Sequence, residues 1–218
     1  LCGAVSGALY QALPPEEGMA SCNDSTSATS VADLHARRQA TYVYPESMGG
    51  GAGAFADSDG QDAIHVHTVN STNLPVEAME LDAPIRVRRW QLVPDSGGAG
   101  RFRGGLGQLK EYEILDDVAG AMSYSHRGER HFTAAAGLQG GGAGGSARST
   151  ITRRDGREEV IPSKVVTWLA PGDRVIISTA GGGGYGPPAA REPEAVARDV
   201  ADGKVGVLTR EGASNRKN

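Results

Sequence analysis

Two histidines separated by a single residue are the first feature of this sequence that could carry chemistry. If His65 and His67 lie on one strand, they point to the same face, where two imidazoles could bind a substrate or ligate a metal ion. A third metal ligand would have to come from Asp59, Asp62 or Glu77, and two ligands alone do not make a site. Ordinary histidines on a polar strand face are the alternative. We predict no metal site, a substrate-binding role for His65 and a catalytic role for His67.

The segment NSTNLPVEAME at 70–80 follows directly and combines amides with carboxylates. The side-chain amides of Asn70 and Asn73 can donate hydrogen bonds to a carbonyl oxygen, and Glu77 can accept a proton or orient water. Pro75 stiffens the backbone between them. We predict that Asn70 and Asn73 bind substrate and that Glu77 is a second catalytic candidate. Amides that cap a loop are the structural alternative.

Four glycine-rich segments occur in order along the chain, at 49–60, 94–107, 137–145 and 179–188. Strand-like apolar runs separate them, so they are not flexible linkers. Gly181 to Gly184 could cradle a phosphate, but Pro187-Pro188 prevents a helix from starting directly after them. We therefore predict a tight turn in which Gly182 or Gly183 has a positive φ. The Walker pattern of nucleotide-binding loops is absent from the sequence, and we predict no cofactor bound by this chain alone.

Short elements must position these residues, and most of them are strands. Alternation of polar and apolar residues predicts a strand over 63–69, and Asp155-Gly156 predicts a hairpin turn. The polar stretch at 21–30 is predicted to be a loop, either a disordered linker or an ordered loop that lines a site. We expect helices at 1–13 and 192–201, and further strands at 42–44, 85–93, 108–115, 121–125, 149–154, 157–161, 164–169 and 174–179.

The predicted fold class is therefore α+β and dominated by β-structure. Many short, mostly antiparallel strands are joined by glycine-rich turns, with short helices near the N- and C-terminal ends. Arg86, Arg88 and Arg89 alternate with apolar residues, which is typical of a solvated strand face; an interface with a partner subunit is the other interpretation.

Composition excludes several classes of partner. The formal net charge of −4, with both signs mixed, argues against nucleic acid and against an anionic membrane as the main partner. The two cysteines are too few for a disulfide framework, and the sequence contains no apolar run long enough for a membrane helix and no signal peptide. We expect a cytoplasmic protein.

In their order and content, the long motifs resemble those of the hydantoinase B/oxoprolinase family. The motifs that carry the resemblance are GGGAGAFADSDGQDAIHVHTVNSTNLPVEAME, RRWQLVPDSGGAGRFRGGLGQLKEYEIL, PGDRVIISTAGGGGYGPPAARE and VARDVADGKV. The resemblance extends over residues 1–205 and corresponds to the C-terminal part of family members. That family includes the B subunit of ATP-dependent N-methylhydantoinase, 5-oxoprolinase and the alpha subunit of acetone carboxylase.

The resemblance implies a function that composition does not show. Family members act with a hydantoinase A-type subunit that binds ATP and magnesium, and phosphorylation activates a cyclic amide or a ketone. The divalent metal of characterised relatives is held by an upstream part. The resemblance thus implies a fragment of a hydrolase for cyclic amides, working in a hetero-oligomer and inactive as this chain alone. A ketone carboxylase and a non-catalytic assembly module are the alternatives.

The resemblance also divides the chain. Residues 1–205 are expected to form the family domain, and the polar residues 206–218 a disordered tail. Because the first residue is Leu1, we expect the sequence to be part of a longer protein.

Overall fold

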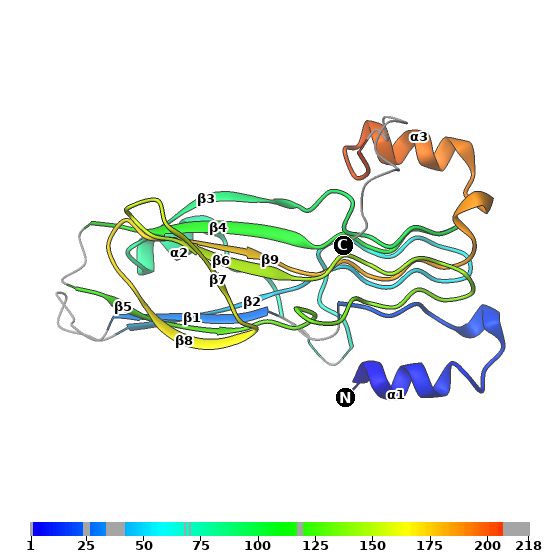
Figure 1. Ribbon diagram of the computed structural model, residues 1–218, viewed down its shortest axis with the longest axis horizontal. Helices are drawn as coiled ribbons and strands as arrows, with labels where there is room; N and C mark the ends of the chain where they lie inside the picture. The colour runs from blue at the N-terminus through cyan, green and yellow to red at the C-terminus, as the bar shows by residue number, and fades with distance from the viewer. Residues whose placement is uncertain are drawn as a thin grey trace.

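The computed structural model of the protein is elongated, with a β-sandwich at one end and a bundle of extended glycine-rich segments at the other (Figure 1). It describes residues 2–23, 27–33, 42–67, 69, 71–116 and 120–206. Helix α1 (Cys2–Leu9) and helix α3 (Pro193–Ala201) lie on opposite sides of the bundle. Two short 3₁₀ helices, Pro15–Glu17 and Pro188–Ala190, lie in the adjoining chain segments. Among the described residues, no helix is long and apolar enough to cross a membrane.

Two antiparallel sheets form the sandwich, which confirms the predicted β-dominated α+β class. The four-stranded sheet has the order β2-β1-β5-β8 and the five-stranded sheet the order β3-β4-β9-β6-β7. The strands are β1 (Ser27–Asp33), β2 (Tyr42–Met48), β3 (Ile85–Leu92), β4 (Gln108–Ile114), β5 (Met122–Arg127), β6 (Arg148–Thr152), β7 (Glu158–Ile161), β8 (Lys164–Leu169) and β9 (Arg174–Ser178).

The core lies between the inner faces of the two sheets. Alternate residues of each strand point inward, so the period of two in the sequence becomes a single apolar layer. Aromatic residues are scarce in the chain, yet Tyr112 and Tyr124 are among its largest fully buried side chains. Around them pack Val31, Met48, Ile85, Ile114, Met122, Ile151, Leu169, Val175 and Ile177.

The turn at Pro171-Gly172-Asp173 joins the two sheets. It connects β8 to β9, but β8 pairs with β5 and β9 pairs with β4 and β6. Gly172 has φ 83°. The carboxylate of Asp173 accepts hydrogen bonds from the amides of Ala170 (2.9 Å) and Arg154 (3.0 Å), which holds the crossing in place.

The glycine-rich segments lie side by side in the bundle and are joined by backbone hydrogen bonds. Four successive amides of the central segment donate in turn to three surrounding segments. Gly181 donates to Gly145 (3.1 Å), Gly182 to Gly105 (2.9 Å), Gly183 to Ser21 (2.8 Å) and Gly184 to Gly142 (2.9 Å). The amides of Gly181 and Gly184 thus donate to the same neighbouring segment, so the hydrogen-bonding direction repeats every third residue, which is the period of the polyproline II helix.

Close packing of backbones is the reason for glycine in this bundle, and the predicted positive φ at Gly182 or Gly183 is wrong. Within 181–186 only Gly186 has a positive φ, of 71°. A Cβ on Gly182 would lie 1.9 Å from the carbonyl oxygen of Ala52, and one on Gly183 would lie 2.1 Å from that of Ala136. Both positions exclude a side chain because another backbone occupies its place.

The predicted strand at 63–69 is also wrong. Ala63 has φ 49° and His67 has φ 58°, and these left-handed residues interrupt an extended chain. Ile64 forms only an isolated bridge with Gly50. His65 and His67 therefore do not share a strand face. Thr68 lies outside the described residues.

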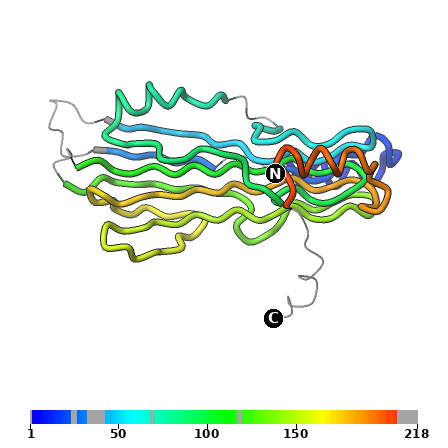
Figure 2. Tube along the Cα trace, turned by 90° about the horizontal axis from the view of Figure 1, so that it is seen from above, coloured from blue at the N-terminus to red at the C-terminus, as the bar shows by residue number. Residues whose placement is uncertain are grey.

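Two further elements differ from the predictions. Part of the predicted loop at 21–30 is strand β1, because Ser27, Thr29 and Val31 alternate inward between β2 and β5. Helix α2 (Val76–Asp82), which was not predicted, begins after Pro75 and buries Met79. Figure 2 shows α2 lying along one edge of the sandwich, next to β3.

Charged pairs cover the outer face of the five-stranded sheet. The Arg88 guanidinium lies 2.6 Å from Glu113, and those of Arg89 and Arg174 each lie 3.1 Å from Glu111. Arg88 and Arg89 of the predicted cluster thus pair with glutamates on the neighbouring strand β4.

Candidate functional site

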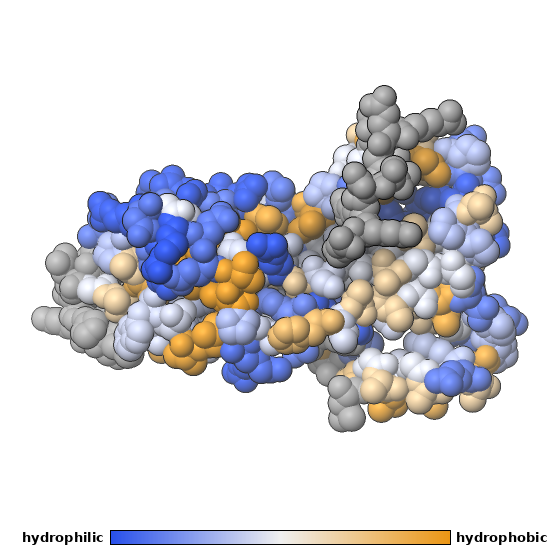
Figure 3. Space-filling view, in the orientation of Figure 1, coloured by the Kyte–Doolittle hydropathy of each residue, from blue (hydrophilic) through white to orange (hydrophobic). Residues whose placement is uncertain are grey.

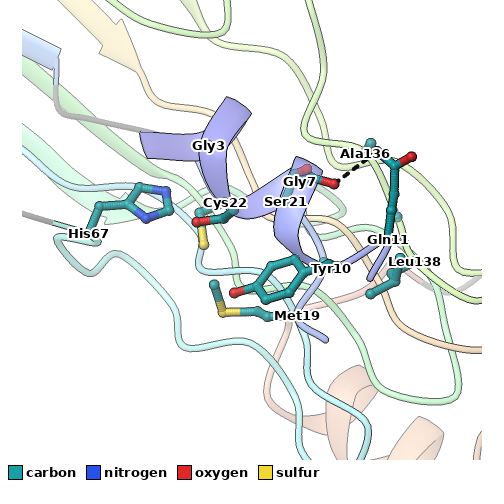
Figure 4. Close-up of a pocket in the computed structure, with 13 residues that line it drawn as sticks. Gly3, Gly7, Tyr10, Gln11, Met19, Ser21, Cys22, His67, Ala136 and Leu138 are labelled. Carbon is teal, nitrogen blue, oxygen red and sulfur yellow. Dashed lines mark hydrogen bonds between the residues drawn. The ribbon is translucent and has the colours of Figure 1, made fainter. Parts of the chain in front are cut away.

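One cleft of the described structure contains a residue of the predicted site. It has a volume of about 200 Å³ and lies between helix α1 and the glycine bundle. Figure 4 shows His67 at one end of the cleft, Ala136 and Leu138 at the other, and Tyr10 with Met19 between them. The left-handed backbone of His67 places its ring at this opening.

Backbone pairing with the bundle forms the floor of this cleft. The amide of Ala20 donates to Ala54 (2.9 Å) and that of Ser21 donates to Ala136 (2.9 Å). The next residue, Cys22, is buried, and its sulfur accepts a hydrogen bond from the amide of Gly53 at 3.2 Å. Cys22 and Tyr10 were not among the predicted site residues, because nothing in the polar stretch around Cys22 indicates pairing with distant glycines.

His65 is half-buried. Neither ring nitrogen has a hydrogen-bond partner among the described residues. Burial lowers the pKa of His65 below its ordinary value. The imidazole is therefore neutral near pH 7 and can accept a proton or a hydrogen bond.

Asn73 and Glu77 of the predicted site do not line this cleft. Asn73 and Glu77 are exposed, and Glu77 belongs to α2 at the edge of the sandwich, whereas α1 and the cleft lie beside the bundle (Figure 1). Asn70 lies outside the described residues. Glu80 has a structural contact, since its Oε1 accepts a hydrogen bond from the Val87 amide at 2.8 Å. Roles for Asn70, Asn73 and Glu77 in substrate binding stay predictions.

A buried ion pair inside the sandwich was not predicted from the sequence. The Lys110 ammonium on β4 contacts the Glu46 carboxylate on β2, and both side chains are almost fully buried. The ammonium also lies 3.9 Å from the centre of the Trp90 ring and 3.3 Å from the Met79 sulfur. Burial raises the pKa of Glu46, and the charge of Lys110 opposes that rise. The pair joins the two sheets across their core.

Two further histidines meet at the end of β5. The rings of His126 and His131 pack edge to face, with centroids 5.5 Å apart. Neither Nε2 has a hydrogen-bond partner among the described residues, while the His126 Nδ1 lies 3.4 Å from the Tyr124 hydroxyl. Burial, and then the neighbouring His131, lower the pKa of His126 to about 4. Both rings are therefore neutral in the folded protein at neutral pH.

A network of charges attaches α3 to the bundle. The Arg191 guanidinium bridges both carboxylate oxygens of Asp59 (2.7 and 2.8 Å) and Asp199 (2.6 Å). Arg103 contacts Asp199 (3.3 Å) and Asp62 (3.2 Å). Burial alone would raise the pKa of Asp59, but hydrogen bonds from Arg191 bring it below its ordinary value. Asp59 and Asp62, considered as metal ligands from the sequence, thus bind arginines.

The described residues do not fit a resident metal. No group of three or more histidine, cysteine, aspartate or glutamate side chains in this part of the chain lies close enough to hold an ion. No metal-dependent step is therefore assigned to the residues described here.

Comparison with known proteins gives the family. A model of the Hydantoinase B/oxoprolinase family matches residues 1–188. The B-type subunit of a putative D-/L-hydantoinase from a Pseudomonas species is 34% identical over 166 residues, which are 75% of this chain and 27% of that protein.

Solved structures show the same fold. The ATP-dependent caprolactamase of Pseudomonas jessenii superposes with a TM-score of 0.74 at 29% identity, over 92% of this chain and 35% of that one. Acetone carboxylase in its nucleotide-free form gives a TM-score of 0.76 at 22% identity, over 95% of this chain and 31% of that one. The chain thus spans about a quarter to a third of the length of these relatives. With 188 of its 218 residues matched by the family model, this chain belongs to the Hydantoinase B/oxoprolinase family.

Proposed function

We propose that this chain is part of the B-type subunit of an ATP-dependent hydrolase that opens cyclic amides. The family match over residues 1–188 carries the proposal. Similarity to the B-type subunit of a hydantoinase and to a caprolactamase supports the substrate class, because hydantoin and caprolactam both contain a ring amide. The proposed partner is an A-type, ATP-binding subunit in the cytoplasm, and the isolated chain hydrolyses nothing.

The chemistry divides between this chain and its partner. ATP bound by the partner would activate the amide oxygen, which makes the ring carbon more electrophilic. His67 opens onto a cleft, and the neutral His65 can accept a proton from water. The amides of Asn70 and Asn73 would hold the amide oxygen as negative charge develops on it, and Glu77 would orient water.

Reconstitution tests this proposal. The chain is co-expressed with an A-type subunit, and the purified complex is assayed for ATP hydrolysis and ring opening with hydantoin, 5-oxoproline and caprolactam. We expect ATP-dependent ring opening of at least one of them by the complex and none by the chain alone. An assembled complex that opens no cyclic amide would contradict the proposal.

Site variants in the active complex test the residue roles. His67→Ala, Asn70→Ala and Asn73→Ala should each lower turnover, by about 10²–10³ for a lost oxyanion donor, with thermal stability little changed. Leu81→Ala, an exposed position on α2, is the control and should keep full turnover. Unchanged turnover in all three site variants would refute their assignment.

A non-catalytic assembly role is the second candidate. It is favoured by the separation of Glu77 from the cleft beside His67. Under this alternative the complex forms with the A-type subunit, and the site variants change neither turnover nor assembly. A ketone carboxylase would instead consume acetone and bicarbonate, so the complex is also assayed with these two compounds in addition to the three cyclic amides.

A further inference from the structure

A larger cleft lies between helix α3 and the glycine bundle. Its volume is about 450 Å³, which is within the range of ligand pockets. Figure 3 shows the surface hollowed between α3 and the bundle. The bundle contributes Gly97, Ala99 and Gly100 to its lining, and the segment that carries α3 contributes Pro188 and Val196. The cleft is therefore bounded by backbone on one side and by apolar side chains on the other.

The bundle wall of this cleft contains backbone donors without acceptors. The amides of Gly97, Ala99 and Gly100 donate to no group among the described residues, whereas the amide of Gly98 donates to Gly182 at 2.8 Å. Gly100 is buried, and a buried amide ordinarily has a hydrogen-bond partner. An acceptor that enters the cleft can therefore bind amides that no described residue uses.

Gly97 and Gly100 are oriented alike. A Cβ on Gly97 would lie 2.0 Å from the carbonyl oxygen of Gly104, and one on Gly100 would lie 2.5 Å from that of Phe102, so both would point to the returning segment 102–104. Residues three apart in a polyproline II helix face the same way. We infer that the two free amides also share a direction.

This spacing of three is the one through which neighbouring segments of the bundle bind each other. Gly142 and Gly145 donate to Ala99 and Ser96, each at 2.6 Å. The free pair at 97 and 100 repeats that spacing in the wall of the cleft. It therefore matches two carbonyl oxygens that lie three residues apart on a further extended chain.

Arg103 adds a side-chain donor to the cleft. Its Nε contacts Asp199 (3.3 Å), and its Nη1 contacts Asp62 (3.2 Å) and the carbonyl of Gly104 (2.6 Å). The side chain is only 5% exposed, yet its Nη2 donates to no described residue and is not enclosed by protein atoms. The guanidinium can therefore donate a further hydrogen bond to a carbonyl oxygen.

The charges that line the cleft favour a neutral ligand. Asp199 lies between Arg103 (3.3 Å) and Arg191 (2.6 Å), so these charges are already paired. The carboxylate of Asp95 is exposed and forms no ion pair with the described residues, and it would repel an organic acid. Peptide carbonyls carry no net charge and accept hydrogen bonds from amides and guanidinium groups.

We propose that this cleft binds an extended, uncharged peptide segment of another polypeptide chain, which joins the bundle as one more extended segment. Two carbonyls of the segment, three residues apart, accept hydrogen bonds from the amides of Gly97 and Gly100, and Arg103 donates to another. Val196 and Pro188 cover the segment on its other side. Glycine and alanine suit it, because backbones in this bundle approach too closely for larger side chains.

NMR titration of the full chain with acetyl-GGAGG-amide, which has the sequence of residues 141–145, tests the proposal. The peptide is added up to about 10 mM, since a few hydrogen bonds give weak binding. The amide signals of Gly97 and Gly100 should shift, and their hydrogen exchange should slow at least about threefold at saturation. Hexanoate, the probe for an organic acid, should leave both signals unchanged.

Charge variants in the cleft wall should weaken binding of the peptide. Val196→Glu is expected to do so at least about tenfold, because it places a carboxylate where uncharged backbone must lie. Ala99→Glu, at an exposed position of the opposite wall, should have the same effect. Val200→Glu is the matched control and should bind like wild type: Val200 is 36% exposed and Val196 44%, both are on α3, and only Val196 lines the cleft. Circular dichroism checks that the variants are folded.

Four outcomes would overturn the proposal. The first two are signals of Gly97 and Gly100 that do not respond to the peptide, and equal binding by the Val196 and Val200 variants. The third is tighter binding of hexanoate than of the peptide, which would make this a site for an organic acid. The fourth is slow exchange of both amides in the free chain, which would show that another part of this chain already occupies the cleft.

Discussion

At the scale of single residues, the sandwich contains a buried ion pair whose two charges stabilise each other. Lys110 and Glu46 face each other across the two sheets, and Trp90 covers the ammonium. Removing one partner of a buried pair leaves an uncompensated charge, whereas removing both does not. The pair should therefore behave as a unit in unfolding experiments.

Lys110→Met is expected to lower the free energy of unfolding by about 3–5 kcal/mol in urea denaturation. The double variant with Glu46→Met should recover most of that loss, since no charge remains buried. Asp116→Asn, in the exposed pair with Arg154, is the control and should cost less than about 1 kcal/mol. A double variant less stable than Lys110→Met alone would show that the pair is not coupled.

The buried His126 should make stability depend on acidity. Its pKa is about 4 in the folded chain, below the ordinary value, so the unfolded chain binds the proton first as pH falls. Stability contributed by the neutral ring is complete above about pH 6.5 and decreases by on the order of 3 kcal/mol towards pH 4. Urea denaturation at several pH values measures this.

His126→Gln provides the control for that dependence. The variant should lose most of the decrease between pH 6.5 and pH 4, although His131, whose pKa burial also lowers, keeps a smaller part of it. The same slope in wild type and His126→Gln would refute the assignment.

At the scale of elements, the glycine bundle depends on backbone approach. Gly182→Ala places a methyl group at the carbonyl oxygen of Ala52, 1.9 Å away before relaxation, so at least about 3 kcal/mol of stability should be lost. Gly7→Ala is the matched control: no atom lies within 4 Å of its added methyl, and alanine favours helix α1. Thermal unfolding of both variants checks this, and equal stability would contradict the packing explanation.

At the scale of the whole molecule, α3 is attached by charges that are far apart in sequence. Arg191→Lys removes the two-oxygen contact with Asp59 and should increase hydrogen exchange of the amides of α3 about tenfold or more. Arg198→Lys, exposed on the same helix, should not change the exchange rates. If both variants exchange like wild type, α3 is held by other contacts.

The sequence by itself determined every strand except β1, the helices near the two ends of the chain and the family. Alternating residues over 85–93, 108–115 and 174–179 predict strands because a sheet with one buried face requires a period of two. The same local rule produced the wrong strand at 63–69. Ala63 and His67 have left-handed backbones, and this segment makes its hydrogen bonds to the neighbouring bundle, which the local pattern of residues does not reveal.

Only the tertiary structure decided how the glycines and the charged residues are used. Gly182 does not have an unusual φ. A side chain is excluded there because the carbonyl of Ala52, 130 positions away in the sequence, occupies the place of its Cβ atom. Likewise Asp59 meets Arg191, and Glu46 meets Lys110, because the fold brings distant segments together. The predicted site residues are separated for the same reason. His67 and Glu77 were predicted to act together because they are close in the sequence, but the fold places His67 beside α1 and Glu77 on α2.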